Sequence, residues 1–393
     1  MYKIILILTI SISFSSCKQN IIKNHPSSNV EFIYRLEKKL EKNFALDSIT
    51  AQKPKYVQLI NFDEDKLILS FLNDFSNSIY LYDYHSTKFL EKRLINKNTS
   101  LVQSLGGYYF NKDRSIYLFD EATSNLILVD STNCIIKQVY IPTSNYRSEY
   151  IKYPVYSLST LNPIIKTRKN LLITGLYPWK IPDSLISKFG LTNKINIDFI
   201  RNDTILFQYP KELYGNGFYW DDPYFNSPYT AFNSKENLLV FSFPVSHDIY
   251  IASKISNGIF TKKAYGGSRE AKDITAMDRK TSLKRETMRN YIQKTDVYGG
   301  IIYDKYNDVY YRFIERHIEK ETENVQLGIK PLGVIILDSE FKIVGESTLG
   351  PSENFHWRNA FVTEEGLNIE KIDKTDLSEE YLKFQIFDLK QLN

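Results

Sequence analysis

Short apolar segments alternate with turn-forming residues along nearly the whole chain. From Val30 onward, runs of about five to seven residues rich in Ile, Val, Tyr and Phe are bounded by Asn, Asp, Gly and Ser, a pattern that predicts β-strands. The clearest runs span residues 66–72, 78–83, 115–120, 237–243, 248–251 and 333–338. We therefore expect an all-β fold.

One pair of strands recurs along the chain. An apolar strand, a polar turn and a second strand with basic residues occupy residues 79–95, 126–141, 249–265, 334–349 and, shortened, 384–392. The copies lie about 45 to 60 residues apart, or near twice that, a spacing typical of four-stranded β-propeller blades. We predict a β-propeller of about six four-stranded blades, with seven as the alternative count. Each repeated pair would form the third and fourth strands of its blade.

A propeller needs its ring to be closed. Residues 31–36 form an apolar run that is placed to complete the last blade beside the C-terminal strands, and this closure would protect the edge strands. A β-sandwich or two stacked barrels are the alternative all-β folds. One segment, at about residues 268–294, has helical periodicity and predicts a short helical insertion across one face of the ring.

Composition supports a globular β protein. The chain has 393 residues, 42% of them hydrophobic and 24% charged, and it contains 29 Tyr and 24 Phe, residues that favour strands. The net charge of +4 is too small and dispersed to favour nucleic acid as a partner. Cys17 and Cys134 are the two cysteines; if Cys17 is modified, Cys134 has no disulfide partner within the chain.

The N-terminus predicts an exported, lipid-anchored protein. Lys3 precedes an apolar run over residues 4–14, and the small residues Ser15 and Ser16 come directly before Cys17, which resembles a bacterial lipobox. We expect a signal peptide at 1–16, a lipidated tether at 17–29 and a single propeller domain at 30–393. The absence of an acidic residue after Cys17 favours the outer membrane; an ordinary signal peptide with a chance cysteine is the alternative.

Catalytic and metal-binding motifs are not found in the sequence. No nucleophile elbow, Cys-x-x-Cys, His-Glu-x-x-His, phosphate-binding loop or dinucleotide-binding glycine pattern occurs, and the five histidines are scattered. We therefore predict no catalytic residues, no metal and no cofactor.

Two aromatic loops and a set of basic residues are candidates for ligand binding. The loops combine aromatic rings with carboxylates or cations, as ligand-binding and interface surfaces do; they contain Tyr219, Trp220, Asp221 and Asp222 in the first, and His356, Trp357 and Arg358 in the second. His247, Arg312 and Lys330 could join Arg358 in a site for an anionic group. The alternative is structural: the aromatic residues plug the channel of the ring, and the basic residues lie separately at turns and strand ends.

Three stretches of the chain resemble the family of predicted bacterial lipoproteins called domain of unknown function 4221. They are residues 243–250 (FPVSHDIY), residues 298–304 (YGGIIYD) together with 309–313 (VYYRF), and residues 361–367 (FVTEEGL). The resemblance implies a propeller-like fold and an envelope location, and it implies no activity.

Two functions remain open at this point. The first is a non-enzymatic binding or scaffold propeller, held at the envelope by its lipid, for a glycan, a peptide or a partner protein. The second is an envelope glycan hydrolase or lyase whose site is assembled from several blades.

Overall fold

The computed structural model describes most of the chain after the N-terminal segment. The described residues are 20–26, 31–50, 53–63, 66–95, 102–144, 153–177, 186, 188–199, 204–215, 217–220, 223–277, 285–318, 329–376 and 378–392. Cys17, Asp221 and Asp222 lie outside them.

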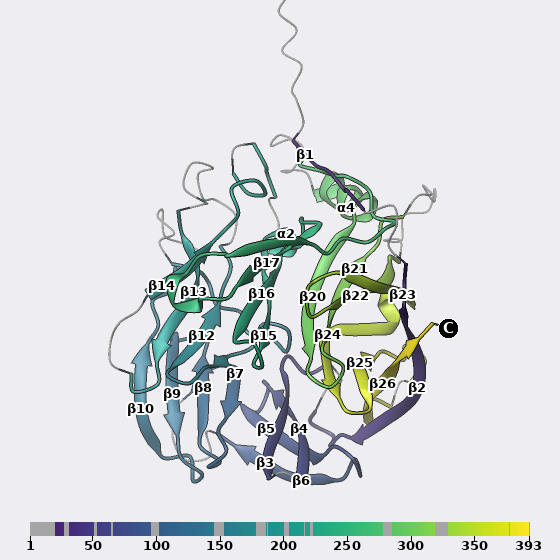
Figure 1. Cartoon of the computed structure of the whole chain (residues 1–393). Helices are drawn as coiled ribbons and strands as arrows, with labels where there is room; N and C mark the ends of the chain where they lie inside the picture. The colour runs from purple at the N-terminus through teal and green to yellow at the C-terminus, as the bar shows by residue number, and fades with distance from the viewer. Residues whose placement is uncertain are drawn as a thin grey trace, which may run out of the picture.

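Four-stranded antiparallel sheets follow one another along the chain and surround a common centre (Figure 1). The first has β3 (Val57–Asp63), β4 (Lys66–Asn73), β5 (Ser78–Asp83) and β6 (Phe89–Leu94), and the second has β7 (Leu105–Phe110), β8 (Ile116–Asp120), β9 (Asn125–Val129) and β10 (Ile135–Tyr140). The third has β11 (Ile165–Lys166), β12 (Asn170–Thr174), β13 (Gly190–Asn196) and β14 (Thr204–Gln208), and the fourth has β15 (Tyr229–Asn233), β16 (Leu238–Ser242), β17 (Asp248–Ala252) and β18 (Lys262–Tyr265).

The position of a strand in its sheet explains its composition. Middle strands such as β4 and β8 are buried on both faces because the neighbouring sheets cover them, and they are therefore almost continuously apolar. The fourth strands β6 and β10 are largely exposed and have basic residues. The repeated pair of the sequence is thus the third and fourth strand of a sheet, as predicted.

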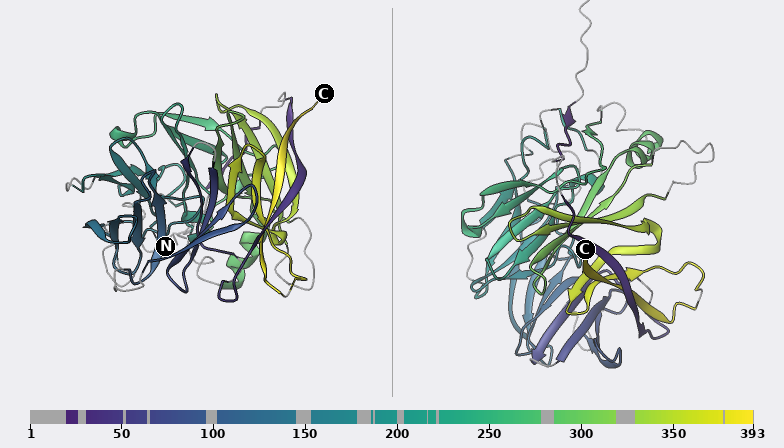
Figure 2. Two further views of the ribbon diagram at one scale, coloured as in Figure 1. Left: turned by 90° about the horizontal axis from the view of Figure 1, so that it is seen from below. Right: turned by 45° about the vertical axis from the view of Figure 1, so that its right-hand side comes forward.

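The remaining eight long strands form one sheet. Its order is β20 (Val297–Asp304), β21 (Val309–Glu315), β22 (Pro331–Asp338), β23 (Ile343–Pro351), β2 (Tyr34–Ala45), β26 (Tyr381–Gln391), β25 (Gly366–Lys371) and β24 (Phe355–Thr363). The N-terminal strand β2 pairs antiparallel with β26 from Tyr34 to Ala45, so the two ends of the chain close the structure together (Figure 2).

The number of separate blades differs from the prediction. We expected about six separate four-stranded blades, whereas the described strands form four separate four-stranded sheets, the eight-stranded one and a two-stranded sheet of β1 and β19. The physical reason is a parallel contact between β2 and β23 at Tyr34 and Gly345. It is possible because Gly345 has no side chain: a Cβ there would lie 2.2 Å from the carbonyl oxygen of Tyr34.

Within the described residues of the segment predicted to be helical, helix is found only in the last part. Helix α4 spans Arg285–Lys294, whereas Ile274–Thr275 form the short strand β19, which pairs with β1 (Ile21–Ile22). Residues 278–284 lie outside the described part. The other described helical elements are the short α2 (Pro223–Asn226) and two 3-10 turns at Ile255–Asn257 and Ser352–Asn354.

Candidate functional site

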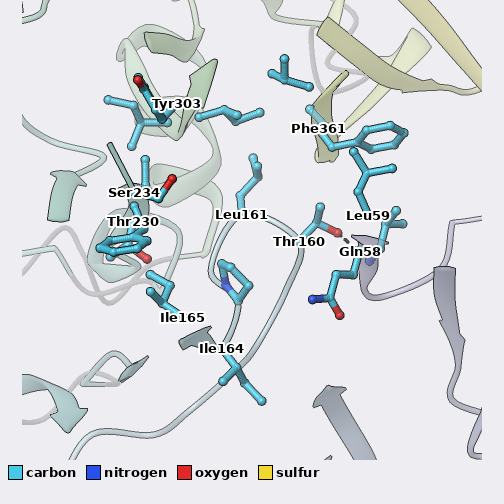
Figure 3. Close-up of a pocket in the computed structure, with 18 of the residues that line it drawn as sticks. Gln58, Leu59, Thr160, Leu161, Ile164, Ile165, Thr230, Ser234, Tyr303 and Phe361 are labelled. Atoms are coloured by element: carbon cyan, nitrogen blue, oxygen red, sulfur yellow. Dashed lines mark hydrogen bonds between the residues drawn. The ribbon is translucent and has the colours of Figure 1, made fainter. Parts of the chain in front are cut away.

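A cavity of about 460 Å³ lies where the first strands of the sheets meet (Figure 3). Its volume is within the range of small-molecule sites. The strands β3, β7, β11, β15, β20 and β24, with residues 160–164 and the turns after β15 and β20, supply its lining. Since β20 and β24 are the two edges of the eight-stranded sheet, that sheet curves until both of its ends reach the cavity.

The cavity wall mixes apolar groups with hydrogen-bonding groups. The apolar and aromatic lining residues include Leu59, Tyr109, Leu161, Ile164, Phe232, Ile301, Tyr303, Tyr306 and Phe361, and the hydroxyl and amide residues are Gln58, Thr160, Thr230 and Ser234. Thr160 is fixed by donating to Asn359 Oδ1 (2.7 Å) and accepting from the backbone N–H of Val57 (2.9 Å). The buried Oε1 of Gln58 has no hydrogen-bond partner among the described residues.

The charge of the lining is positive. Lys166 and Lys305 line the cavity, and none of its described lining residues is Asp, Glu, His or Cys. Lys166 donates to the side chain of Asn111, and Lys305 lies 4.9 Å from the ring centre of Tyr306. Asp113 is outside the lining; its pKa is lowered first by hydrogen bonds from Ser115, and the charge of Lys166 adds a small part.

The opening of the cavity is at the end where β15 and β20 finish. Ser234 follows β15, and Lys305 and Tyr306 follow β20; all three line the cavity and are exposed. At the beginning of β20 the ring is filled instead. A Cβ on Gly299 would lie 2.7 Å from the indole of Trp357, and a Cβ on Gly300 would lie 2.2 Å from Leu161.

The second predicted loop is instead a strand: His356, Trp357 and Arg358 lie near the start of β24, at the filled end of the ring. Trp357 is 4% exposed, stacks on Phe313 (5.5 Å between ring centroids) and donates its Nε1–H to Glu315 Oε1 (2.8 Å). The guanidinium of Arg358 lies 4.4 Å from the centre of the same indole. His356 is turned to a different partner, with Nδ1 at 3.0 Å from Glu370 Oε2.

The first aromatic loop is also packed into the protein where it is described. Tyr219 forms an isolated β-bridge with Met277. Trp220 is 5% exposed and donates to the carbonyl of Leu213 (2.6 Å). Neither residue lines the cavity.

Arg312 and His247 do lie together, but inside the protein. The Arg312 guanidinium is completely buried and stacks on Tyr298, 4.0 Å from the ring centre. It donates to Ser242 Oγ (2.9 Å) and to the carbonyl oxygens of His247 (3.1 Å), Gly266 (2.9 Å), Ser246 (2.7 Å) and Phe243 (3.4 Å). Burial lowers the pKa of Arg312 to about 10, so it stays charged at neutral pH.

Lys330 is separate from that pair and stabilises the end of a helix. Its ammonium donates to the carbonyl oxygens of Ile292 (3.0 Å) and Thr295 (2.8 Å) at the C-terminus of α4, where a cation is favoured. Burial lowers the pKa of Lys330 to about 8. Among the described candidate residues, the structure therefore brings His247 to Arg312 and Trp357 to Arg358. Lys330 is linked to the second pair only through the charge of Glu315, and His356 has a different partner.

His247 should make the protein sensitive to acid. Burial, and next the charge of Arg312, lower the pKa of His247 from 6.5 to about 4, while Nδ1 lies 2.8 Å from the hydroxyl of Tyr298. Between these pH values the unfolded chain takes up a proton that the folded protein excludes, so stability is lost as the pH falls. We expect the free energy of unfolding to decrease by up to about 3 kcal/mol from this residue, as measured by denaturant titration at several pH values.

Substitution of His247 tests this prediction. His247→Phe should flatten the dependence of stability on pH between 6.5 and 4. An equal slope for the unmodified protein and His247→Phe would contradict the assignment.

The cavity residues were missed by the sequence analysis because they are single residues from distant segments. The usable signal is positional: the segments 106–110 and 299–303 follow the repeated strand pairs, and Tyr109 and Tyr303 lie in them. The first strands of the repeats occupy equivalent positions in a propeller, so their alignment indicates which residues line the central cavity.

The described part of the chain has neither a metal site nor a membrane-spanning helix. No group of three or more His, Cys, Asp and Glu within them is arranged to hold a metal ion. Helices long and apolar enough to cross a membrane are likewise missing from this part of the chain.

Comparison with known proteins gives the family and the fold. A crystal structure of a DUF4221 family member from Bacteroides vulgatus is similar, with a TM-score of 0.73 and 18% identity over 92% of this chain and 99% of that one. A Bacteroides fragilis protein thought to be exported has a TM-score of 0.54 and 12% identity over 92% and 96% of the two chains. No curated protein matches the sequence significantly. The family described as domain of unknown function (DUF4221) matches residues 33–348, and the chain therefore belongs to that family.

Proposed function

We propose that this chain is a non-catalytic binding propeller of the cell envelope, and that its central cavity binds a small anionic carbohydrate. The observation that supports this most is the composition of the cavity: two lysines, several hydroxyl and amide groups and aromatic rings share one space of about 460 Å³. Such a mixture of apolar walls and a few convergent polar groups is typical of ligand sites.

The proposal includes a six-bladed ring. The eight-stranded sheet divides at the contact of β2 with β23 into β20–β23 and a second group of β24, β25, β26 and β2. Together with the four separate sheets, this division gives six groups of four strands. Each of these six groups contributes its first strand to the cavity lining. A ligand in the cavity would therefore be surrounded by all six groups.

A negative charge on the ligand follows from the lysines. Within the described residues, neither Lys166 nor Lys305 forms a salt bridge, and no carboxylate faces them across the cavity. A carboxylate on the ligand would accept hydrogen bonds from these ammonium groups, and such charge-assisted bonds are stronger than neutral ones.

A carbohydrate fits the remaining groups. Sugar hydroxyls both donate and accept hydrogen bonds, as do the hydroxyls of Ser234 and Thr230. The rings of Tyr109, Tyr303 and Tyr306 offer flat apolar faces for the C–H side of a sugar ring.

A peptide or a partner protein is the competing ligand, and hydrolysis or lysis of a glycan is the competing activity. The described lining contains lysine and tyrosine, which can act as acids or bases, but neither a carboxylate nor an imidazole to pair with them.

The envelope location rests on Cys17 and its lipobox-like context. Several acyl chains on one cysteine would hold the protein firmly, and the residues after Cys17 favour the outer membrane. The protein would then display its cavity to glycans of the envelope.

Matched pairs of acidic and neutral sugars test the ligand class. Isothermal titration of the chain that starts after Cys17 would compare galacturonate with galactose, glucuronate with glucose, and N-acetylmuramate with N-acetylglucosamine. We expect at least one acid to bind, and to bind at least about ten-fold more tightly than its neutral partner.

Three variants localise the binding. Lys166→Gln should weaken it about ten-fold through loss of a charge-assisted hydrogen bond, and Ser234→Trp should block the opening. Lys254→Gln, an exposed lysine outside the lining, should change nothing. Equal binding of the acids and their neutral partners, binding of none of the sugars, or unaltered binding by Ser234→Trp would refute the proposal; release of altered sugar products would favour the enzyme.

A further inference from the structure

The N-terminal segment at residues 20–26 lies on the ring as part of the folded structure. Strand β1 pairs with β19 through Ile21 with Thr275 and Ile22 with Ile274. The carbonyl of Asn20 accepts a hydrogen bond from the backbone N–H of Ala276 (2.8 Å). Ile22 also packs against the main hydrophobic core.

Asn24 fixes the segment with every hydrogen-bonding group of its amide. Its Nδ2 donates to the carbonyl oxygens of Ser268 (3.1 Å) and Ala271 (2.7 Å), and its Oδ1 accepts from the hydroxyl of Tyr265 (2.7 Å). Its backbone N–H donates to Asp273 Oδ1 (2.8 Å). The position of residues 20–24 is therefore determined by several independent contacts.

This segment lies at the end of the ring opposite to the opening of the cavity. Lys272 N donates to Asp296 Oδ2 (2.7 Å), directly before β20, and Tyr291 of α4 donates to the carbonyl of Thr275 (2.7 Å). Figure 1 accordingly shows β1 beside α4. The opening is at Lys305 and Tyr306, after the other end of β20. A strand of this length separates the two places by about 25 Å.

The distance from the lipid to the ring is therefore short. Three peptide units connect Cys17 to Asn20, and a fully extended chain spans at most about 11 Å over that length. A free linker from Cys17 to the start of the folded domain would have been several times longer.

We propose that the end of the ring formed by β1, β19 and α4 faces the membrane, and that the cavity opens away from it. This inference rests on the lipid at Cys17 that is part of the proposed function. The exposed charges around β1 are of both signs, with Lys23, Lys272 and Arg289 beside Glu270, Asp273 and Glu286. The attachment of residues 20–24, rather than attraction of this surface to lipid, would therefore set the orientation.

Fluorescence quenching by the bilayer tests the orientation. The lipidated full chain would be reconstituted in vesicles that contain a lipid with a quencher in its headgroup region, with Cys134→Ser removing the exposed free cysteine. A dye would be attached to Arg289→Cys on α4 or to Ser234→Cys at the opening. We expect several-fold stronger quenching at position 289 than at position 234.

The controls separate the two proposals. Cys17→Ser should release the protein from the vesicles; if it stays bound, the lipid anchor is wrong. If the protein is anchored through Cys17 but both dyes are quenched equally, or position 234 more strongly, the orientation is wrong. Asn24→Ala should reduce the difference between the two dyes because it removes three hydrogen bonds of the segment, and an unchanged difference would mean that this attachment does not set the orientation.

Discussion

Arg312→Ala is expected to lower the free energy of unfolding by about 3–5 kcal/mol, one of the two largest effects of a single substitution that we predict. The guanidinium is fully buried and forms five hydrogen bonds, four of them to backbone carbonyl oxygens around the turn after β16 and the end of β18. Removing it takes a donor from each of these buried acceptors, although the carbonyl oxygens of Phe243 and His247 each keep one backbone N–H. It also opens a cavity beneath Tyr298.

Denaturant unfolding of matched variants measures this effect. Arg168→Ala, at an exposed position, should change stability by less than about 0.5 kcal/mol. If Arg312→Ala does not fold, Ser242→Ala provides a milder test: it removes only the acceptor of Nε–H and the donor to the carbonyl of Gly299, and should cost about 1–2 kcal/mol. A loss below 1 kcal/mol for Arg312→Ala would contradict its role as the central donor of this region.

Closure of the ring by β2 gives the second large prediction. Phe44 is completely buried and packs edge-on against Tyr82 of the first sheet (5.7 Å) and Phe384 of β26 (6.0 Å), so it joins the beginning and the end of the ring. Phe44→Ala should cost about 3–5 kcal/mol. Deleting residues 31–46 should abolish cooperative unfolding and cause aggregation, because it exposes the edges of β23 and β26.

Leu40 is the control on the same strand. It is 38% exposed, so Leu40→Ala should cost less than about 1 kcal/mol. Calorimetry and denaturant unfolding would compare the two variants. Cooperative unfolding with unchanged stability after deletion of residues 31–46 would contradict closure by β2.

The sequence pattern predicted much of the fold because each strand of a sheet has a characteristic environment. The contrast between the buried β5 and the exposed, basic β6 is visible in the residues, and it repeats in β9 with β10. The closing strand was predicted only in part: the expected run at residues 31–36 overlaps β2 at its first three residues, and β2 continues to Ala45 through mostly charged residues. The count of separate sheets was not, because the contact of Tyr34 with Gly345 depends on the approach of two strands some three hundred residues apart, which no local pattern encodes.

The cavity was harder to predict for a similar reason. Aromatic residues beside charges drew attention to Trp357, Arg358 and Arg312, yet identical residue types also serve packing when they are buried together. Lys166 and Lys305 belong to no recognisable motif in the sequence. They become candidates for ligand binding only because the fold places both in the lining of the same cavity. Sites assembled from single residues of many strands give no spaced motif.

The place where an acidic sugar binds is the most direct test of the central claim, which is that the centre of the ring is a ligand site. The tightest-binding acid of the three pairs would be soaked into crystals of the chain that starts after Cys17. We predict electron density for the sugar inside the cavity, with its carboxylate within hydrogen-bond distance of Lys166 or Lys305 and its ring beside Tyr109, Tyr303 or Tyr306. Density for the sugar elsewhere on the protein, with the cavity containing only water, would contradict the account.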